Sequence, residues 1–218
     1  AQAIYPPVAF VLGLLFFFLL IKKIFDYRVA LLGCTFLAFI PPYLYRTMSG
    51  FNDKEAMGMV LFFAALYFFI SGWQEEKLNK SIILSSLAGL STGIMGLIWG
   101  GFAFLVSIIA LFCLINFVFL EFNKKKLFSY AAWYVIFYLI MILFRDYNLN
   151  IIFGVYYNAL ALLTLVTGIG IYLGLKYNLK SIIEKKIKLP YTNSILISVT
   201  LIGIILSFIF MGKGFVFG

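Results

Sequence analysis

The chain alternates between long apolar runs and short polar segments. Each run is close to the roughly 20 residues that a helix needs to cross a bilayer core, and none contains Asp, Glu, Lys or Arg. The runs also lack the polar–apolar alternation of barrel strands. They are Ile4–Ile21, Val29–Tyr45, Ala56–Gly72, Ile82–Ile98, Phe102–Leu120, Phe128–Phe144, Ile151–Leu175 and Ser194–Met211. The pattern predicts an all-α integral membrane protein with about eight transmembrane helices.

The composition excludes a soluble enzyme. Of the 218 residues, 64% are hydrophobic and only 11% are charged, and the mean hydropathy is +1.08. A soluble domain has about a quarter of its residues charged. The sequence contains no His, which removes imidazole as a metal ligand or general base. Cys34 and Cys113 lie inside apolar runs, where packing is the simplest role.

The basic residues divide unevenly between the two sides of the membrane. One set of connecting segments holds 13 of the 17 Lys and Arg residues: Lys22, Lys23, Arg28, Lys77, Lys80, Lys124, Lys125, Lys126, Lys176, Lys180, Lys185, Lys186 and Lys188. The other set holds Arg46, Lys54, Arg145 and Lys213. Because Lys and Arg accumulate in cytoplasmic loops, both termini and the loops around Asn52, Trp99 and Asp146 are expected to face outward. The net charge of +9 then reflects inner loops that contact lipid headgroups, and no nucleic-acid partner is expected.

The predicted spans contain no Asp, Glu, Lys or Arg that could couple transport to an ion. Such transporters use intramembrane ionisable groups and broken helices. A transporter of a polyprenol lipid or small solute stays an alternative, supported if Asn158 or Thr164 lined a continuous cavity. The pairs Gly89/Gly93 and Gly170/Gly174 have the spacing that lets membrane helices approach closely, and we expect them to pack.

Polar chemistry concentrates in the first outward loop. Pro41-Pro42 should end or kink the second span, and Gly50 allows a tight turn. The loop then brings Asp53 and Glu55 to the start of the third span. Asn52-x-x-Glu55 fits a helix capping box, while an Asp-x-Glu pair offers oxygen ligands to Mg²⁺ or Mn²⁺. The two interpretations are compatible.

Other outward residues have similarly open interpretations. Arg46 either anchors a helix end in the headgroups or binds a phosphate bidentately. Arg145 either pairs with Asp146 or contacts an anion. Trp99 is an ordinary interfacial residue, but Gly100 and Gly101 after it make a close turn at which a backbone or ligand can approach.

These residues resemble a known family. The segment Arg46-Thr-Met-Ser-Gly-Phe-Asn-Asp-Lys-Glu55, followed two spans later by Trp99-Gly-Gly-Phe102, is similar to the catalytic subunit of oligosaccharyltransferase, and most of all to archaeal members. In that family an Arg, a Gly and an Asp-x-Glu motif occur in this order in an outer loop. The detailed resemblance covers about Pro6 to Phe104, and the later spans fit the family in outline.

The resemblance implies a GT-C type transmembrane fold and an activity. The family transfers a glycan from a dolichol- or polyprenol-phosphate carrier to Asn in Asn-x-Ser/Thr of an acceptor polypeptide, on the outer face of the membrane and with Mg²⁺ or Mn²⁺. Carried over by motif, Asp53 and Glu55 are catalytic metal-site residues, with Asp53 as a metal ligand and Glu55 in contact with the metal or the acceptor amide, and Arg46 lies near the carrier phosphates. Arg145 is a second candidate for binding the lipid phosphate, on the strength of its own position at an outward corner and not of the motif. The motif residues Gly50, Trp99, Gly100 and Gly101 would be structural parts of the active face.

The chain also departs from the family pattern. Residues 1–218 are predicted to form a single transmembrane domain that corresponds to spans two to nine of a longer enzyme. The family's first acidic motif, a later loop with a catalytic Glu and the soluble domain with its Trp-Trp-Asp motif have no counterpart in this sequence. We therefore expect no transfer activity from this chain alone. A non-catalytic membrane scaffold is a further alternative, in which alanine at Asp53 or Glu55 would be silent.

Overall fold

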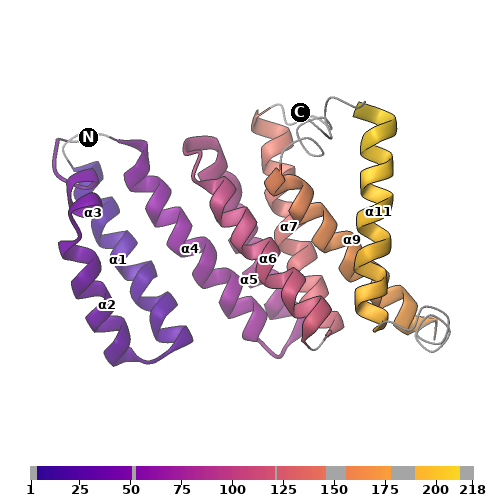
Figure 1. The fold of residues 1–218 in the computed structure, drawn as a ribbon. Coiled ribbons are helices and arrows are strands. Elements are labelled where there is room, and N and C mark those ends of the chain that lie inside the picture. The colour runs from indigo at the N-terminus through magenta and orange to yellow at the C-terminus, as the bar shows by residue number, and fades with distance from the viewer. Residues whose placement is uncertain (1–3, 51–52, 121, 146–155, 178–189, 212–218) are drawn as a thin grey trace. The chain divides into compact units, whose positions relative to one another are not determined.

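The computed structural model describes residues 4–50, 53–120, 122–145, 156–177 and 190–211, with side chains described up to 203 and not at 145. These parts form nine α-helices (Figure 1). Six of them are long and apolar enough to cross a membrane by length and composition. Their bounds are α1 Tyr5–Ile24, α2 Tyr27–Phe39, α3 Pro41–Arg46, α4 Lys54–Gln74, α5 Leu78–Ile98, α6 Phe102–Phe119, α7 Lys124–Arg145, α9 Tyr156–Lys176 and α11 Tyr191–Met211.

The break expected at Pro41-Pro42 in the second span is confirmed. The apolar run Val29–Tyr45 is divided into α2 and the short α3, with Ile40 in an extended conformation between them. Pro41 and Pro42 occupy the first positions of α3, where a missing N–H costs nothing. A proline also disfavours helical backbone in the residue before it. The two prolines therefore end α2 and restart the chain as α3.

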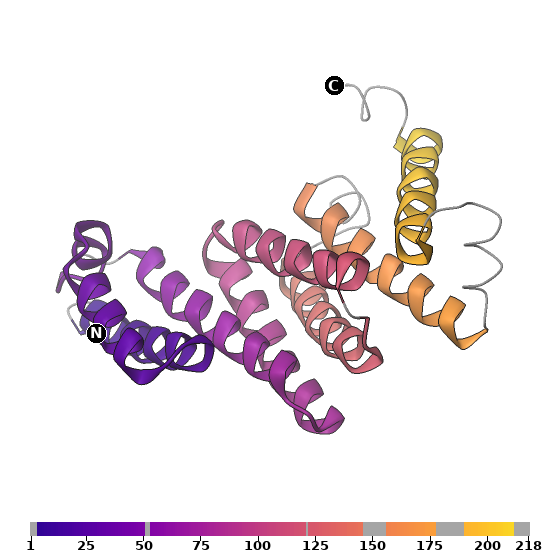
Figure 2. The ribbon, with the colours of Figure 1, turned by 60° about the horizontal axis from the view of Figure 1, so that its bottom comes forward.

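The chain divides into two compact units. The first consists of Ala1–Leu105 with Ala132–Asp146, and the second of Val106–Ala131 with Tyr147–Gly218. In the first unit α4 packs between α1 and α5 (Figures 1 and 2). Aromatic side chains fill the α1–α4 contact, as in the pair Phe17 and Phe63, whose ring centroids are 5.0 Å apart.

The glycines of α5 allow α7 to approach closely within the first unit. A Cβ on Gly89 would lie 2.6 Å from the backbone oxygen of Trp133, and one on Gly93 would lie 2.8 Å from Ile140. The indole N–H of Trp133 donates to the Thr92 hydroxyl at 3.1 Å. The packing role expected for Gly89 and Gly93 is confirmed.

The second unit is held by hydroxyl groups bound to helix carbonyls. Tyr130 donates to the carbonyl of Ala161 at 2.8 Å, and Tyr191 donates to that of Gly170 at 3.0 Å. A Cβ on Gly174 would overlap the Tyr191 ring. The expectation that Gly170 and Gly174 form a packing surface is confirmed, because both face α11.

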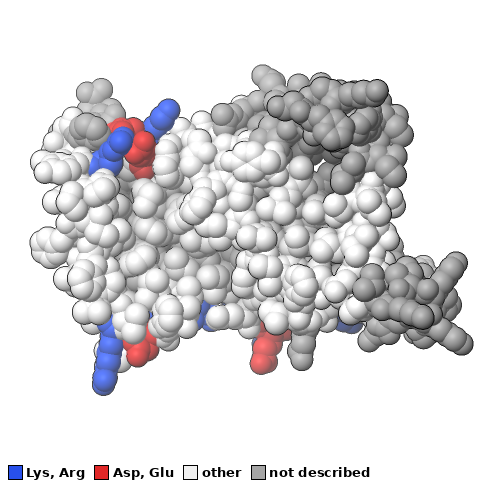
Figure 3. Space-filling view, in the orientation of Figure 1, with Lys and Arg blue, Asp and Glu red and all other residues white. Residues whose placement is uncertain are grey.

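Charged side chains gather at the two ends of the helices in the first unit, and the surface between them is apolar (Figure 3). At one end lie Arg46, Asp53, Lys54 and Glu55 around the start of α4; at the other lie Lys22, Lys23 and Arg28 between α1 and α2. An apolar belt between charged ends is the surface that a bilayer requires.

Candidate functional site: a carboxylate pair at the start of helix α4

The loop from α3 to α4 brings Arg46 back to the acidic residues. Arg46 is the last residue of α3, and Asp53 is the N-cap of α4. Between them Gly50 has φ +87°, a left-handed conformation that L side chains rarely adopt. The short helix α3 and this turn reverse the chain, so that Arg46 faces the first turn of α4.

Arg46 binds both carboxylates with one nitrogen. Its Nη1 pairs with Oδ2 of Asp53 and lies 2.9 Å from Oε2 of Glu55. The side chains of Arg46, Asp53 and Glu55 are 44%, 23% and 31% exposed, so the cluster is half-buried and open to ligands. One oxygen from each of the two carboxylates at the start of α4 thus contacts the same nitrogen of Arg46.

Asp53 also caps the helix. Its Oδ1 accepts from the backbone N–H of Glu55 at 3.3 Å, while Oδ2 faces Arg46. The expected capping box is therefore wrong in its cap residue, which is Asp53; Asn52 itself lies outside the described residues. Capping and cation binding use different oxygens of the same carboxylate.

The pKa of Asp53 lies below its ordinary value. Partial desolvation acts to raise the pKa, but the hydrogen bond and charge of Arg46, with the backbone N–H groups of Glu55 and Lys54, outweigh it. Asp53 is thus ionised at neutral pH, as a cation ligand must be.

This lowered pKa gives a pH dependence with a definite sign. The stabilisation by the Asp53–Arg46 pair is fully present above the ordinary Asp pKa of about 4, and it is lost as pH falls through the lower folded-state pKa. We expect the difference in melting temperature between the unsubstituted chain and Asp53→Asn to shrink as pH falls from about 7 to about 3. A difference that grows on acidification contradicts the assignment.

Trp99 packs under the carboxylate cluster on α4. A Cβ on Gly58 would lie 2.6 Å from the indole ring, and one on Gly101 would also lie 2.6 Å from it. The ring is thus held between a glycine of α4 and a glycine of its own turn. Gly100 has open space around it and is exposed. The Trp99 turn therefore lies against α4 one helical turn after Glu55, and the indole ring leaves no room for a side chain at Gly58 or Gly101.

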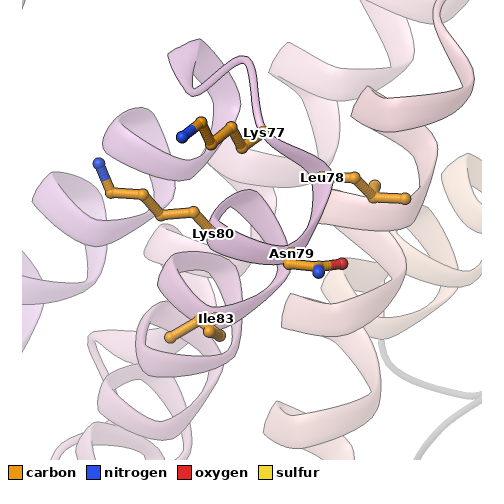
Figure 4. A pocket seen from close by; sticks show the side chains of 5 residues that line it. All are labelled: Lys77, Leu78, Asn79, Lys80 and Ile83. Atoms are coloured by element: carbon orange, nitrogen blue, oxygen red, sulfur yellow. The ribbon is translucent and has the colours of Figure 1, made fainter.

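The opposite end of the same helices has a shallow hollow of about 530 Å³ lined by Lys77, Leu78, Asn79, Lys80 and Ile83 (Figure 4). Lys80 forms an ion pair with Glu75 at 2.7 Å. The hollow lies at the start of α5, at the opposite end of α4 from the carboxylate pair.

The polar residues that would have supported a transporter are packed. Asn158 and Thr164 are both 0% exposed. The Thr164 hydroxyl donates to the carbonyls of Leu160 and Ala110. These contacts favour a structural role over one in a solute path.

Comparison with known proteins identifies the family. The model described as "Oligosaccharyl transferase STT3, N-terminal" matches residues 3–215. The chain belongs to this family. It is 29% identical over 115 residues to the STT3 subunit of the Saccharomyces cerevisiae dolichyl-diphosphooligosaccharide–protein glycosyltransferase, covering 53% of this chain and 16% of that protein. It is 28% identical over 137 residues to glycotransferase 3 of Archaeoglobus fulgidus, covering 57% and 16%.

Solved structures of the Archaeoglobus fulgidus oligosaccharyltransferase share the fold. One with a tethered acceptor peptide containing the NVT sequon matches with TM-score 0.73 and 24% identity, over 97% of this chain and 27% of that one. One in complex with Zn and sulfate matches with TM-score 0.73 and 23% identity, over 96% and 28%. One with an inhibitory peptide and a dolichol-phosphate matches with TM-score 0.72 and 21% identity, over 98% and 26%. The expected multi-pass transmembrane fold is confirmed, and the chain spans about a quarter of these structures.

The family assignment leaves the site residues to be judged from the geometry. The structure brings together Arg46, Asp53 and Glu55, with Trp99 packed one turn further along α4. It does not test Arg145, whose side chain lies outside the described residues together with Asp146. Within the described part of the chain, no three His, Cys, Asp or Glu side chains form a cluster that could hold a metal. The described residues therefore supply two acidic ligands at most.

Sequence reasoning missed Tyr5. Its hydroxyl donates to the backbone carbonyl of Asp53 and accepts from the backbone N–H of Met57, both at 3.1 Å. The only local signal is a tyrosine ahead of the Pro6-Pro7 pair at the start of α1. Nothing in that pattern indicates a partner about 50 residues further along the chain.

Proposed function

We propose that this chain forms part of the transmembrane domain of an oligosaccharyltransferase, with the carboxylate pair at its active face. The enzyme would transfer an oligosaccharide from a dolichol- or polyprenol-phosphate carrier to Asn of an Asn-x-Ser/Thr acceptor. The observation that carries the proposal is the convergence of Asp53 and Glu55 on one cationic atom of Arg46 at the start of α4. Family membership supplies the reaction class.

Asp53 and Glu55 would hold a Mg²⁺ or Mn²⁺ ion. Both offer carboxylate oxygens, which these cations prefer, and their ability to meet at one cation is the fit that the site requires. The remaining ligands would come from other segments or from water. Such an ion supplies charge stabilisation for the carrier phosphate as leaving group.

Arg46 would bind the carrier phosphate. A guanidinium matches phosphate oxygens bidentately, and the half-exposed position of Arg46 leaves it within reach of an anion at the membrane surface. Its present pairing with both carboxylates means that a bound cation would displace it and free it for the phosphate. The carboxylates would thus exchange one cation for another as the site fills.

Partners and orientation follow from the same proposal. The Archaeoglobus fulgidus structures contain an acceptor peptide or a dolichol-phosphate, which supports a lipid-linked oligosaccharide and a sequon polypeptide as substrates here. The active face would be outward, with both chain termini on that side, in agreement with the distribution of basic residues. The chain would act as one section of a longer enzyme, since it covers 27% of the archaeal structure.

Transfer by the protein in its native reading frame tests the proposal. The purified enzyme in nanodiscs, given Mn²⁺, lipid-linked oligosaccharide and a sequon peptide, is expected to glycosylate the peptide and to stop when the metal is chelated. A peptide with Gln in place of the acceptor Asn is the matched control. Transfer that persists in chelator contradicts the metal site, and no transfer in any condition favours the scaffold alternative.

A further inference from the structure

The first turn of α4 is closed through a side chain of another helix. In a regular helix the Met57 N–H would donate to the carbonyl four residues earlier, that of Asp53. Here the Met57 N–H donates to the Tyr5 hydroxyl, and that hydroxyl donates in turn to the Asp53 carbonyl. The Asp53 carbonyl also accepts from Ala56 at 3.3 Å. The hydroxyl thus stands between the two backbone groups.

The start of α2 shows the ordinary arrangement. Asp26 caps α2 through its side chain, as Asp53 caps α4. There the N–H of Ala30 donates directly to the Asp26 carbonyl at 3.1 Å. The inserted hydroxyl therefore distinguishes the start of α4 from the start of α2.

Packing holds Tyr5 in place. Tyr5 is the first residue of α1, and its ring contacts the buried cluster of Ala9, Ala56 and Val60 between α1 and α4. The ring position fixes the hydroxyl, because a tyrosine side chain has only two rotatable bonds before its oxygen. Helix α1 therefore sets the shape of the first turn of α4.

That turn carries both acidic side chains. Asp53 and Glu55 flank Lys54, and the backbone carbonyl of Asp53 is the group that Tyr5 holds. A change in the backbone there redirects both carboxylates, and groups that bind a cation must be held within about half an ångström. We propose that Tyr5 is a positioning residue that holds Asp53 and Glu55 in the orientation in which they share one cation. This inference rests on the metal site of the proposed function.

Tyr5→Phe tests the inference because it keeps the ring packing and removes only the hydroxyl. Titration of the chain in nanodiscs with Mn²⁺, followed by electron paramagnetic resonance, is expected to give roughly tenfold weaker binding, as for groups that orient metal ligands. Tyr191→Phe is the matched control, since it removes a hydroxyl bound to the Gly170 carbonyl in the other unit. It should leave Mn²⁺ binding unchanged. Incorporation of 4-aminophenylalanine at position 5, which restores a hydrogen-bond donor, should recover part of the affinity.

The outcomes separate this inference from the proposed function. If Mn²⁺ binding to the unsubstituted chain does not depend on Asp53, the metal site itself fails. If binding depends on Asp53 but Tyr5→Phe binds as tightly as the unsubstituted chain, only the positioning role is overturned.

Hydrogen exchange of the Met57 amide is a measurement that needs no variant. If the Tyr5 bridge and the cation site are coupled, saturating Mn²⁺ is expected to slow exchange at Met57 about tenfold, because binding and local opening are linked. Exchange that Mn²⁺ leaves unchanged at Met57 overturns the inference even where Tyr5→Phe does not fold.

Discussion

Asp53→Asn is expected to lower glycan transfer at least about a hundredfold while helix α4 stays folded. Asparagine caps a helix about as well as aspartate, so the bond to the Glu55 N–H is kept. The substitution removes the negative charge that would bind the cation, and loss of one charge-stabilising group at an active site costs about 10²–10³ in rate. The measurements are transfer to a sequon peptide and the melting temperature of the same preparation.

Asp26→Asn is the matched control for this prediction. Asp26 caps α2 through its side chain, accepting from the Val29 N–H at 2.8 Å, and lies at the opposite end of α1 from the site. It should change neither transfer nor Mn²⁺ binding. A role of Asp53 in capping alone is supported if Asp53→Asn keeps full activity and Asp53→Ala loses stability. A scaffold role is supported if both variants are silent for transfer.

Arg46→Gln is expected to move metal binding and transfer in opposite directions. Arg46 pairs with both carboxylates and so competes with any cation at that position. Each half-exposed pair contributes about 0.2–1 kcal/mol, so their removal should tighten Mn²⁺ binding about three- to tenfold. Transfer should fall about a hundredfold, because no guanidinium then stabilises the carrier phosphate. The measurements are Mn²⁺ titration and the transfer rate at saturating metal.

Two further substitutions serve as controls for Arg46→Gln. Arg46→Lys keeps the charge but loses the planar fork, so it should retain much of the competition with metal while transfer stays low. Arg28→Gln removes an exposed arginine at the other end of α1, bound to Tyr27 at 3.2 Å, and should change neither quantity. If Arg46→Gln weakens Mn²⁺ binding, Arg46 supports the carboxylates instead of competing for them, and the exchange of cations is wrong.

Much of the site could be predicted from sequence because its signals are local. Asp53, Glu55 and Gly50 lie within six residues, and each has a strong chemical or conformational reason to be in that loop. The positive φ of Gly50 and the break before Pro41 follow from backbone sterics alone. The identity of the cap residue was the local feature predicted wrongly, because Asn and Asp are almost equally good caps.

The partners of these residues could not be predicted, because they depend on how separate helices pack. An apolar helix in a membrane shows no hydrophobic stripe that tells which side faces a neighbour. The contact of Trp99 with Gly58 and the insertion of Tyr5 into the first turn of α4 join residues about 40 to 50 positions apart.

The sequence by itself determined that this protein is a multi-span helical membrane protein, and its loop motif identified the family. The membrane class follows from the length of the apolar runs and the placement of charge, because a bilayer core demands both. The family follows from the spacing of the residues in the first outward loop. Only the tertiary structure decided that Arg46 holds both carboxylates and that Tyr5 of α1 shapes the turn that carries them. The reason is physical: the direction of a side chain at a helix start is set by hydrogen bonds from whichever helix packs beside it, and packing is a property of the folded chain.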